Sequence, residues 1–349
     1  MNWTVTGRRG SALGIVETTL RYALVLVGLT GATACSAAPK TFNTNDPASP
    51  LKLERIIPLP DVSGRIDHLA LDTAHGRLFV AEYGNGTVDE IDLAGGRPLG
   101  RIGGLHQPQG VAYLDRLDEI VVACGDGAVH FYAASDRREV AHLNLGGDAD
   151  NVRIDSRNGH VIIGYGDGGL AVIDPTEARV LSRILLAGHP EGFRLRGSRA
   201  YINIPDRGEI VAADVDSGRV LSSWSTGMHR LNFPLAIEPS GREVVVAYRL
   251  PAALQRRDAD TGKVIDTRPA CGDADDLFLD GERQYLICGA GHIDVSTPSR
   301  PHEASVRVNT APGARTGLFS TELKKLFVAV PARGRPAAIW ILVAAAGRH

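Results

Sequence analysis

The sequence has few of the features by which enzymes and nucleic-acid-binding proteins are usually identified. Only 5% of its 349 residues are aromatic, and 38 basic side chains nearly balance 40 acidic ones. Such a chain lacks the basic surface and stacking platforms that nucleic acids require, so we expect no nucleic-acid partner. It also contains no Gly-x-Ser-x-Gly elbow and no closely spaced His-x-His or Cys-x-x-Cys pair. No catalytic motif is therefore evident.

Helical patterns and cysteines are also scarce. After residue 50 there is no helix-length amphipathic stretch, whereas 40 glycines separate many short apolar runs. This composition predicts an all-β fold rich in turns.

Besides Cys35 there are three cysteines, so an oxidised chain keeps at least one free thiol. We expect Cys124 and Cys288, at equivalent positions of two repeats, to be buried and unpaired, with a Cys271–Cys288 disulfide as the alternative.

The N-terminus has the pattern of an export signal. Basic residues precede a 13-residue apolar stretch, 22–34, which is too short to span a membrane comfortably. The stretch ends in Ala-Thr-Ala before Cys35, which fits either a lipidated cysteine or ordinary signal cleavage. We expect a signal peptide at 1–34, a polar lipoprotein-type tether at 35–50, a single domain at 51–344 and a short tail at 345–349. The protein would then be exported, as a periplasmic protein or as a lipoprotein held to the membrane only through its lipid.

A short segment recurs seven times, and each copy has a polar residue or arginine before an apolar run. Successive copies begin 42, 41, 41, 41, 43 and 40 residues apart. A fixed period of this length indicates a propeller or solenoid. The copies begin at Asp67, Gln109, Asp150, Glu191, Asn232, Asp275 and Arg315.

Each repeat reads as four strands, which predicts a seven-bladed β-propeller with four-stranded blades. Asn-Gly and Asp-Gly turns between the second and third strands are strong hairpin signals, because the turn needs positive φ. The last repeat has only three strands before the chain ends. Residues 51–58 match the missing outer strand, so we expect the N-terminal strand of the mature chain to close the last blade.

These repeats resemble the YVTN-repeat (YncE-like) propeller family. The resemblance is carried by Leu78-Phe-Val-Ala with 85–92, and by Tyr201-Ile-Asn with Gly208-Glu-Ile-Val. It covers about residues 51–344, although no blade has the intact signature tetrapeptide. It implies a propeller fold and an exported bacterial protein, but no reaction.

The candidate site follows from the position of the first strand of each blade. This strand is innermost in a propeller, so the residues at its start should surround one mouth of the central channel. Crowded carboxylates there would raise one another's pKa values unless a cation such as Arg65, Arg230 or Arg315 compensates. The candidate ligand-binding residues are Asp67, His68, Gln109, Asp150, Asn151, His189, Glu191, Asn232, Asp275, Asp276 and Arg315.

Three interpretations of this ring remain open. Its residues could hold the blades together, bind a small ligand, or bind a metal. For a metal, Asn151, Glu191, Asn232 and Asp275 offer the hard oxygen ligands that suit a divalent cation such as Ca²⁺. Six-bladed lactonases use a similar set, which is an analogy between different propellers.

The leading functional hypothesis is a non-enzymatic binding or scaffold module of the cell envelope, with its ligand face at the channel mouth. Its partner would be a small ligand or an envelope protein. The alternative is a divalent-metal-dependent hydrolase of lactonase type. In that enzyme Asp67 and His68 would form the acid–base pair, with the four oxygen ligands around the metal.

Overall fold

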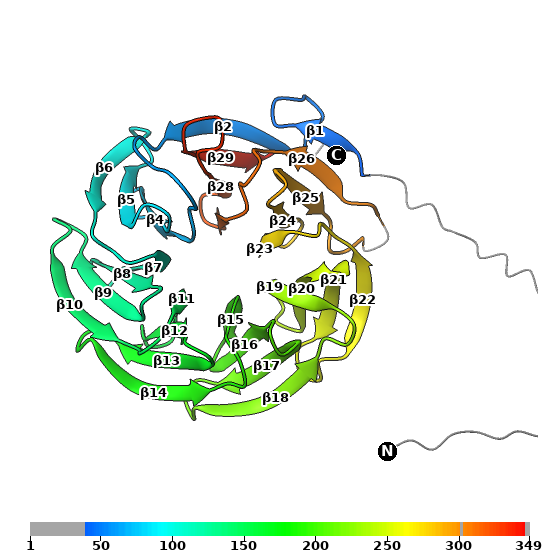
Figure 1. Ribbon diagram of the computed structural model, residues 1–349. Coiled ribbons are helices and arrows are strands. Elements are labelled where there is room, and N and C mark those ends of the chain that lie inside the picture. Colours follow the sequence, from blue (N-terminus) through cyan, green and yellow to red (C-terminus); the bar gives the residue numbers. More distant parts are fainter. Residues whose placement is uncertain (1–38, 301–302, 346–349) are drawn as a thin grey trace, which may run out of the picture. The chain divides into compact units, whose positions relative to one another are not determined.

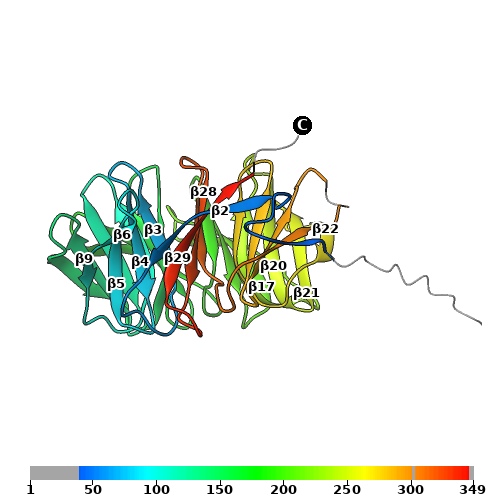
Figure 2. The same ribbon diagram turned by 90° about the horizontal axis from the view of Figure 1, so that it is seen from above.

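The computed structural model describes residues 39–300 and 303–345. The expected signal peptide, Cys35 and residues 346–349 of the expected tail lie outside this range. Seven sheets form a closed ring, as Figure 1 shows, and the strands run between the two faces of that ring (Figure 2). The described residues contain 29 strands and no helix. The fold is therefore an all-β seven-bladed propeller, as the repeat predicts.

In this range, no helical segment has the length and apolar character needed to cross a membrane.

Blades 1 to 4 each contain four consecutive antiparallel strands. Blade 1 consists of β3 (Leu69–Asp72), β4 (Arg77–Glu82), β5 (Thr87–Asp92) and β6 (Arg97–Ile102). Blade 2 consists of β7 (Pro108–Leu114), β8 (Glu119–Cys124), β9 (Ala128–Ala133) and β10 (Glu139–Asn144). Blade 3 consists of β11 (Ala149–Ile154), β12 (Val161–Tyr165), β13 (Gly169–Asp174) and β14 (Arg179–Leu185). Blade 4 consists of β15 (Phe193–Arg196), β16 (Arg199–Ile204), β17 (Glu209–Asp214) and β18 (Arg219–Ser225).

Blades 6 and 7 also receive strands from the start of the described chain. Blade 5 consists of β19 (Arg230–Ile237), β20 (Glu243–Leu250), β21 (Ala252–Asp258) and β22 (Val264–Pro269). Blade 6 consists of β23 (Ala274–Leu279), β24 (Gln284–Cys288), β25 (His292–Ser296), β26 (Val306–Asn309) and β1 (Thr41–Asn43). Blade 7 consists of β27 (Gly317–Ser320), β28 (Lys325–Val330), β29 (Ala338–Ala344) and β2 (Leu51–Pro58).

The expected closure of the ring is confirmed. Strand β2 pairs antiparallel with β29 along the outer edge of blade 7. It also contributes to the packing on both sides of this blade. Leu51 belongs to the apolar cluster between blades 6 and 7, and Ile57 belongs to the cluster between blades 7 and 1.

The core of the described domain lies between the blades. Seven apolar clusters occur, one at each interface between neighbouring blades. The second and third strands of the blades are nearly continuous apolar runs because neighbouring blades cover both of their faces. In β4, for example, five of six residues are buried.

One element differs from the expectation for the N-terminal segment. Residues 35–50 were expected as a polar tether, but Thr41–Asn43 form β1, which pairs parallel to β26. The amide of Asn309 donates to Asn43 Oδ1 at 3.0 Å. An unpaired outer strand offers main-chain donors and acceptors that a polar segment can satisfy, and three residues are too few to show a strand pattern in the sequence.

The innermost strands β3, β7, β11, β15, β19, β23 and β27 have two distinct ends. We call the end where each strand begins the mouth end, and the end where it turns into the next strand the turn end. The second hairpin of each blade reaches the mouth end. In blade 1, for example, the Gly84 N–H donates to Arg65 O at 2.9 Å and the Leu105 N–H donates to Gly86 O at 3.1 Å. Gly86 has a φ of 69°, and a Cβ there would lie 2.8 Å from Leu105 O. This turn therefore requires glycine.

Candidate functional site

A pocket opens at the mouth end of the innermost strands. The four carboxylates of Asp67, Asp150, Glu191 and Asp275 all line it, although they come from blades 1, 3, 4 and 6. The repeat alignment therefore places these side chains in the correct register. The cavity has a volume of about 40 Å³. It is also lined by Arg65, His68, Asn151, Arg153, Gly192, Arg194, Phe233, Pro234, Leu235, Asp276 and Thr316.

The carboxylates of blades 1 and 3 lie beside cations. The Arg65 guanidinium is 2.6 Å from Asp67 Oδ2, and His68 Nε2 is 3.4 Å from Asp150 Oδ1. Burial would lower the pKa of His68, but Asp150 and Asp67 outweigh this and raise it to about 9. Burial also favours the neutral form of Asp150, yet His68 and Arg65 hold its pKa below the usual value. His68 is therefore a cation at neutral pH, paired with an ionised Asp150.

The pKa of Asp67 shifts in the opposite direction to that of Asp150. Burial, with the nearby Asp150 and Asp275 carboxylates, raises the pKa of Asp67 to about 7 despite His68 and Arg65. Its side chain is almost completely buried. Asp67 therefore holds its proton more tightly than its neighbour Asp150, whose pKa is lowered.

Asp275 is held by two arginines. Arg249 of β20 donates to Asp275 Oδ1, and Arg315 Nε lies 3.5 Å from the other oxygen. The Arg249 guanidinium also stacks on the Phe233 ring, 3.9 Å from its centroid. Burial raises the pKa of Asp275, although both arginines oppose this. Two cations thus share one carboxylate on this side of the pocket.

Glu191 differs from the other three carboxylates because it has no such partner. Among residues 39–300 and 303–345, no side chain or backbone group forms a hydrogen bond or ion pair with its carboxylate. Burial, together with Asp150, raises the pKa of Glu191 to about 7. A half-buried carboxylate without a donor, facing a pocket, is available to a ligand.

The pocket also contains two arginines that are not among the predicted site residues. Arg153 and Arg194 lie on the first strands of blades 3 and 4, three residues after Asp150 and Glu191. Both occupy the fourth position of their repeat, where the other five copies have Ala, Leu or Phe. An arginine at a channel-facing position that is otherwise apolar was the available signal.

Several expected site residues hold the structure together instead of facing the pocket. Gln109 donates to Asp148 Oδ1 at 2.6 Å, and His189 Nδ1 donates to the Gly166 carbonyl at 2.6 Å. Neither side chain lines the cavity. Both tie a loop at the mouth end to its neighbour, which is the structural role considered for this ring.

Asn232 is also outside the pocket, so the four expected metal ligands are not brought together. Its amide donates to Asn203 Oδ1 at 3.1 Å and to the Glu209 carbonyl at 2.9 Å. These bonds bridge blades 4 and 5. Asn151 Oδ1 does face the pocket, but it accepts a bond from Arg153 at 3.0 Å.

Two further ring residues connect blades while lining the cavity. Asp276 Oδ2 accepts the Gly317 N–H at 2.8 Å, and Thr316 donates to the Ile66 carbonyl at 3.2 Å.

Of the three arginines expected to compensate the carboxylates, Arg65 and Arg315 lie beside Asp67 and Asp275. Arg230 donates instead to the carbonyl oxygens of Gly227 and His229. His68 and Arg249 are the further cations beside these acids.

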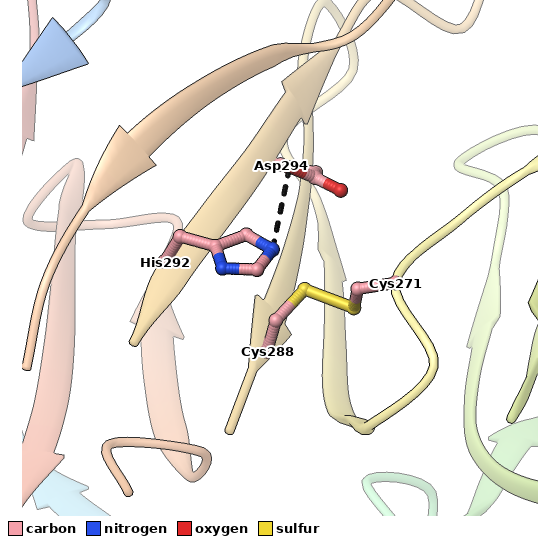
Figure 3. A group of neighbouring side chains, drawn as sticks. All are labelled: Cys271, Cys288, His292 and Asp294. Carbon is pink, nitrogen blue, oxygen red and sulfur yellow. Dashed lines mark ion pairs between the residues drawn. A yellow bond between two sulfur atoms is a disulfide. The ribbon is translucent and has the colours of Figure 1, made fainter. Parts of the chain in front are cut away.

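A second group of potential ligand atoms lies in blade 6. Cys271, Cys288, His292 and Asp294 are buried together, with ligand atoms within 4.8 Å of one another (Figure 3). The two sulfur atoms form a disulfide, so they do not act as thiolate ligands in this form. The expectation that Cys288 is unpaired is therefore wrong.

Cys124 is a buried free thiol, as expected. Burial and Asp126 raise its pKa to about 12.

No family model matches the chain, and no curated protein does. A similar solved structure is Kuenenia stuttgartiensis hydrazine synthase, which is 13% identical, with a TM-score of 0.70. The match covers 82% of this chain and 98% of that chain. At this level of identity it shows the propeller fold alone.

Proposed function

We propose that this propeller is a binding module whose ligand occupies the mouth end of the central channel. The observation that carries the proposal is the half-buried carboxylate of Glu191, which has no partner in the part of the chain that the structure describes. Neighbouring acids in the same pocket have cations or backbone donors, as Asp67, Asp275 and Asp276 illustrate. A ligand that donates a hydrogen bond to Glu191 would satisfy this group.

The cell-envelope role rests on the sequence. The apolar stretch before Cys35 supports an exported protein that is either periplasmic or anchored through a lipid on that cysteine. The resemblance to YVTN-repeat propellers agrees with export. We therefore propose that the module acts in the cell envelope, where its partner would be a small ligand or another envelope protein.

The hydrolase alternative has weaker support. A lactonase-type metal site needs Asn151, Glu191, Asn232 and Asp275 to point toward one ion, but Asn232 bridges two blades and Asp275 is bound by two arginines. His68 lies beside Asp150, whereas the expected acid–base pair was Asp67 and His68. No observation among the described residues favours catalysis over binding.

The first prediction tests binding through Glu191. A library of small polar molecules is screened by the shift in melting temperature, on the wild type and on Glu191→Gln. Compounds that bind the channel should stabilise the wild type and lose most of this effect in Glu191→Gln, because Gln keeps the shape but removes the charge.

Glu177→Gln is the matched control, since Glu177 is exposed and pairs with Arg179 on the outer surface. It should respond like the wild type. If no compound distinguishes Glu191→Gln from Glu177→Gln, the channel is not the ligand site.

A further inference from the structure

Two arginine side chains meet in the channel without a carboxylate between them. Arg153 Nε donates to the Phe193 carbonyl oxygen at 3.1 Å, and Arg194 Nη1 donates to the same oxygen at 3.0 Å. The two guanidinium groups are therefore direct neighbours. Within the described ranges, no carboxylate oxygen lies within 4.0 Å of either group. Asp276 is the nearby acid that acts on both, from beyond that distance.

This arrangement is electrostatically unfavourable without a further partner. Burial and the neighbouring Arg194 lower the pKa of Arg153 to about 9. Burial also lowers the pKa of Arg194. A half-buried charge that is unpaired costs free energy, and two like charges side by side cost more. Both costs are relieved when an anion bridges the pair.

We propose that Arg153 and Arg194 form an oxyanion subsite, which holds the carboxylate group of a small ligand in the channel. This inference rests on the proposed function, because it names the ligand class of the same pocket. A guanidinium presents a planar fork of donors that matches the two oxygens of a carboxylate. The Phe193 carbonyl accepts from both guanidinium groups, and Arg153 also donates to the Val152 carbonyl at 2.7 Å and to Asn151 Oδ1 at 3.0 Å. A guanidinium has five N–H donors, so about two of Arg153 and about four of Arg194 remain for the ligand.

The size of the cavity limits what can enter it. A volume of about 40 Å³ accommodates roughly three water-sized groups, by the usual requirement of about 10–15 Å³ for each. A carboxylate with its adjoining carbon has this size. The rest of a larger ligand would extend toward the mouth.

The mouth end sets the second chemical requirement. Glu191, three residues before Arg194, lines the same cavity as the two arginines. Asp67 of blade 1 lines it as well. Their oxygens are acceptors when ionised. The ligand we infer is therefore a small carboxylic acid that also bears a hydrogen-bond donor, such as an amine or hydroxyl group.

The second prediction tests this subsite with sodium acetate and glycine, titrated into the intact protein by calorimetry at constant ionic strength. Acetate should bind the wild type, and glycine more tightly, because only glycine also has a donor for Glu191. Acetamide has the same shape without the charge and should bind at least about tenfold more weakly than acetate.

Arg153→Gln and Arg194→Gln should each weaken acetate binding by about tenfold or more. The ligand-free Arg194→Gln variant should melt at the wild-type temperature or above it, since it removes one of two repelling charges. Arg153→Gln should melt below Arg194→Gln, because it also loses the bonds to the Val152 carbonyl and to Asn151 Oδ1. Arg179→Gln, an exposed arginine of the outer strand β14, is the control and should bind acetate like the wild type.

Two results overturn the subsite. Either acetate fails to bind the wild type, or it binds Arg153→Gln and Arg194→Gln as tightly as Arg179→Gln. If compounds from the library still depend on Glu191 in either case, only the oxyanion subsite is wrong. If no compound depends on Glu191 either, the proposed channel function is wrong as well.

Discussion

The two ends of the innermost strands bear charged residues of the same types, but these residues form different interactions at each end. At the turn end, Asp72 accepts Arg77 Nε at 2.7 Å and the His75 N–H at 3.1 Å. Arg77 continues to Asp118 of blade 2 at 2.8 Å. These bonds join two blades, and they hold the pKa of Asp72 below its usual value despite the burial that would raise it.

The turn end of blade 3 repeats the arrangement. Asp155 accepts Arg157 Nη2 at 2.6 Å, and the same arginine reaches Asp216 of blade 4 at 2.7 Å. At the mouth end, by contrast, Glu191 has no donor among the described residues, and Arg153 and Arg194 face each other. Paired charges thus join neighbouring blades at the turn end, whereas the mouth end combines paired charges with these three, which have no oppositely charged partner in the described residues. The unpartnered charges, not the residue types, distinguish the proposed binding end from the structural end.

The largest effect should follow from breaking a pair at the turn end. Asp72→Ala leaves the guanidinium of Arg77 with one of its buried partners missing, which should lower the free energy of unfolding by about 3 kcal/mol. Asp216→Ala removes an exposed partner and should cost less than about 1 kcal/mol. Urea denaturation of both variants measures the difference. Equal, small losses would show that the turn end is not the structural end.

The two ends of the innermost strands can be located from the sequence, because the period and phase of the repeat show where each of these strands begins. The closing strand β2 matches the predicted range 51–58. It follows from a regular apolar pattern in that segment. The convergence of Asp67, Asp150, Glu191 and Asp275 follows from the same phase.

The partners with which these side chains form hydrogen bonds and ion pairs were not predictable from the sequence, because they come from other strands and neighbouring blades. Asn232 occupies the repeat position of Glu191, yet it turns to Asn203 of blade 4. Arg249, which binds Asp275, comes from the second strand of blade 5. The repeat predicts a position beside the channel only for residues at the start of a first strand. Cys271 lies in a loop, so the repeat phase does not place its sulfur beside that of Cys288.

A smaller effect should appear at the mouth end as a dependence on pH. The pKa of Glu191 is raised to about 7 in the folded protein, from about 4.5 in the unfolded chain. The folded state therefore holds this proton more tightly, and the resulting stability is present below pH 4.5 and lost as the pH rises through 7. The raised pKa values of Asp67 and His68 act with the same sign.

Glu191→Gln removes the contribution of this one group. Between pH 5 and pH 8 the wild type should lose about 1–2 kcal/mol more stability than the variant, allowing for coupling among these acids. Chemical denaturation at the two pH values measures this loss. An identical decline in both proteins would mean that Glu191 is not held in a desolvated, unpaired state.

The smallest effect compares single hydroxyl groups at the two ends. Tyr285 and Tyr248 are both completely buried. Tyr285 donates to Asp280 Oδ2 at 2.7 Å at the turn end of blade 6. Tyr248 pairs in register with Asn232 at the mouth end of blade 5, and its hydroxyl has no partner in the described residues. Tyr285→Phe should therefore cost about 1.5 kcal/mol, the low end of the range for a hydrogen bond to a charged group. Tyr248→Phe removes a buried hydroxyl that is unsatisfied, so it should leave the protein equally stable or more stable.

Both substitutions delete one oxygen without creating a large cavity, which makes them a matched pair in thermal or urea unfolding. If Tyr248→Phe proves the more destabilising of the two, the hydroxyl at the mouth end is satisfied and the contrast between the ends does not extend beyond the charged groups.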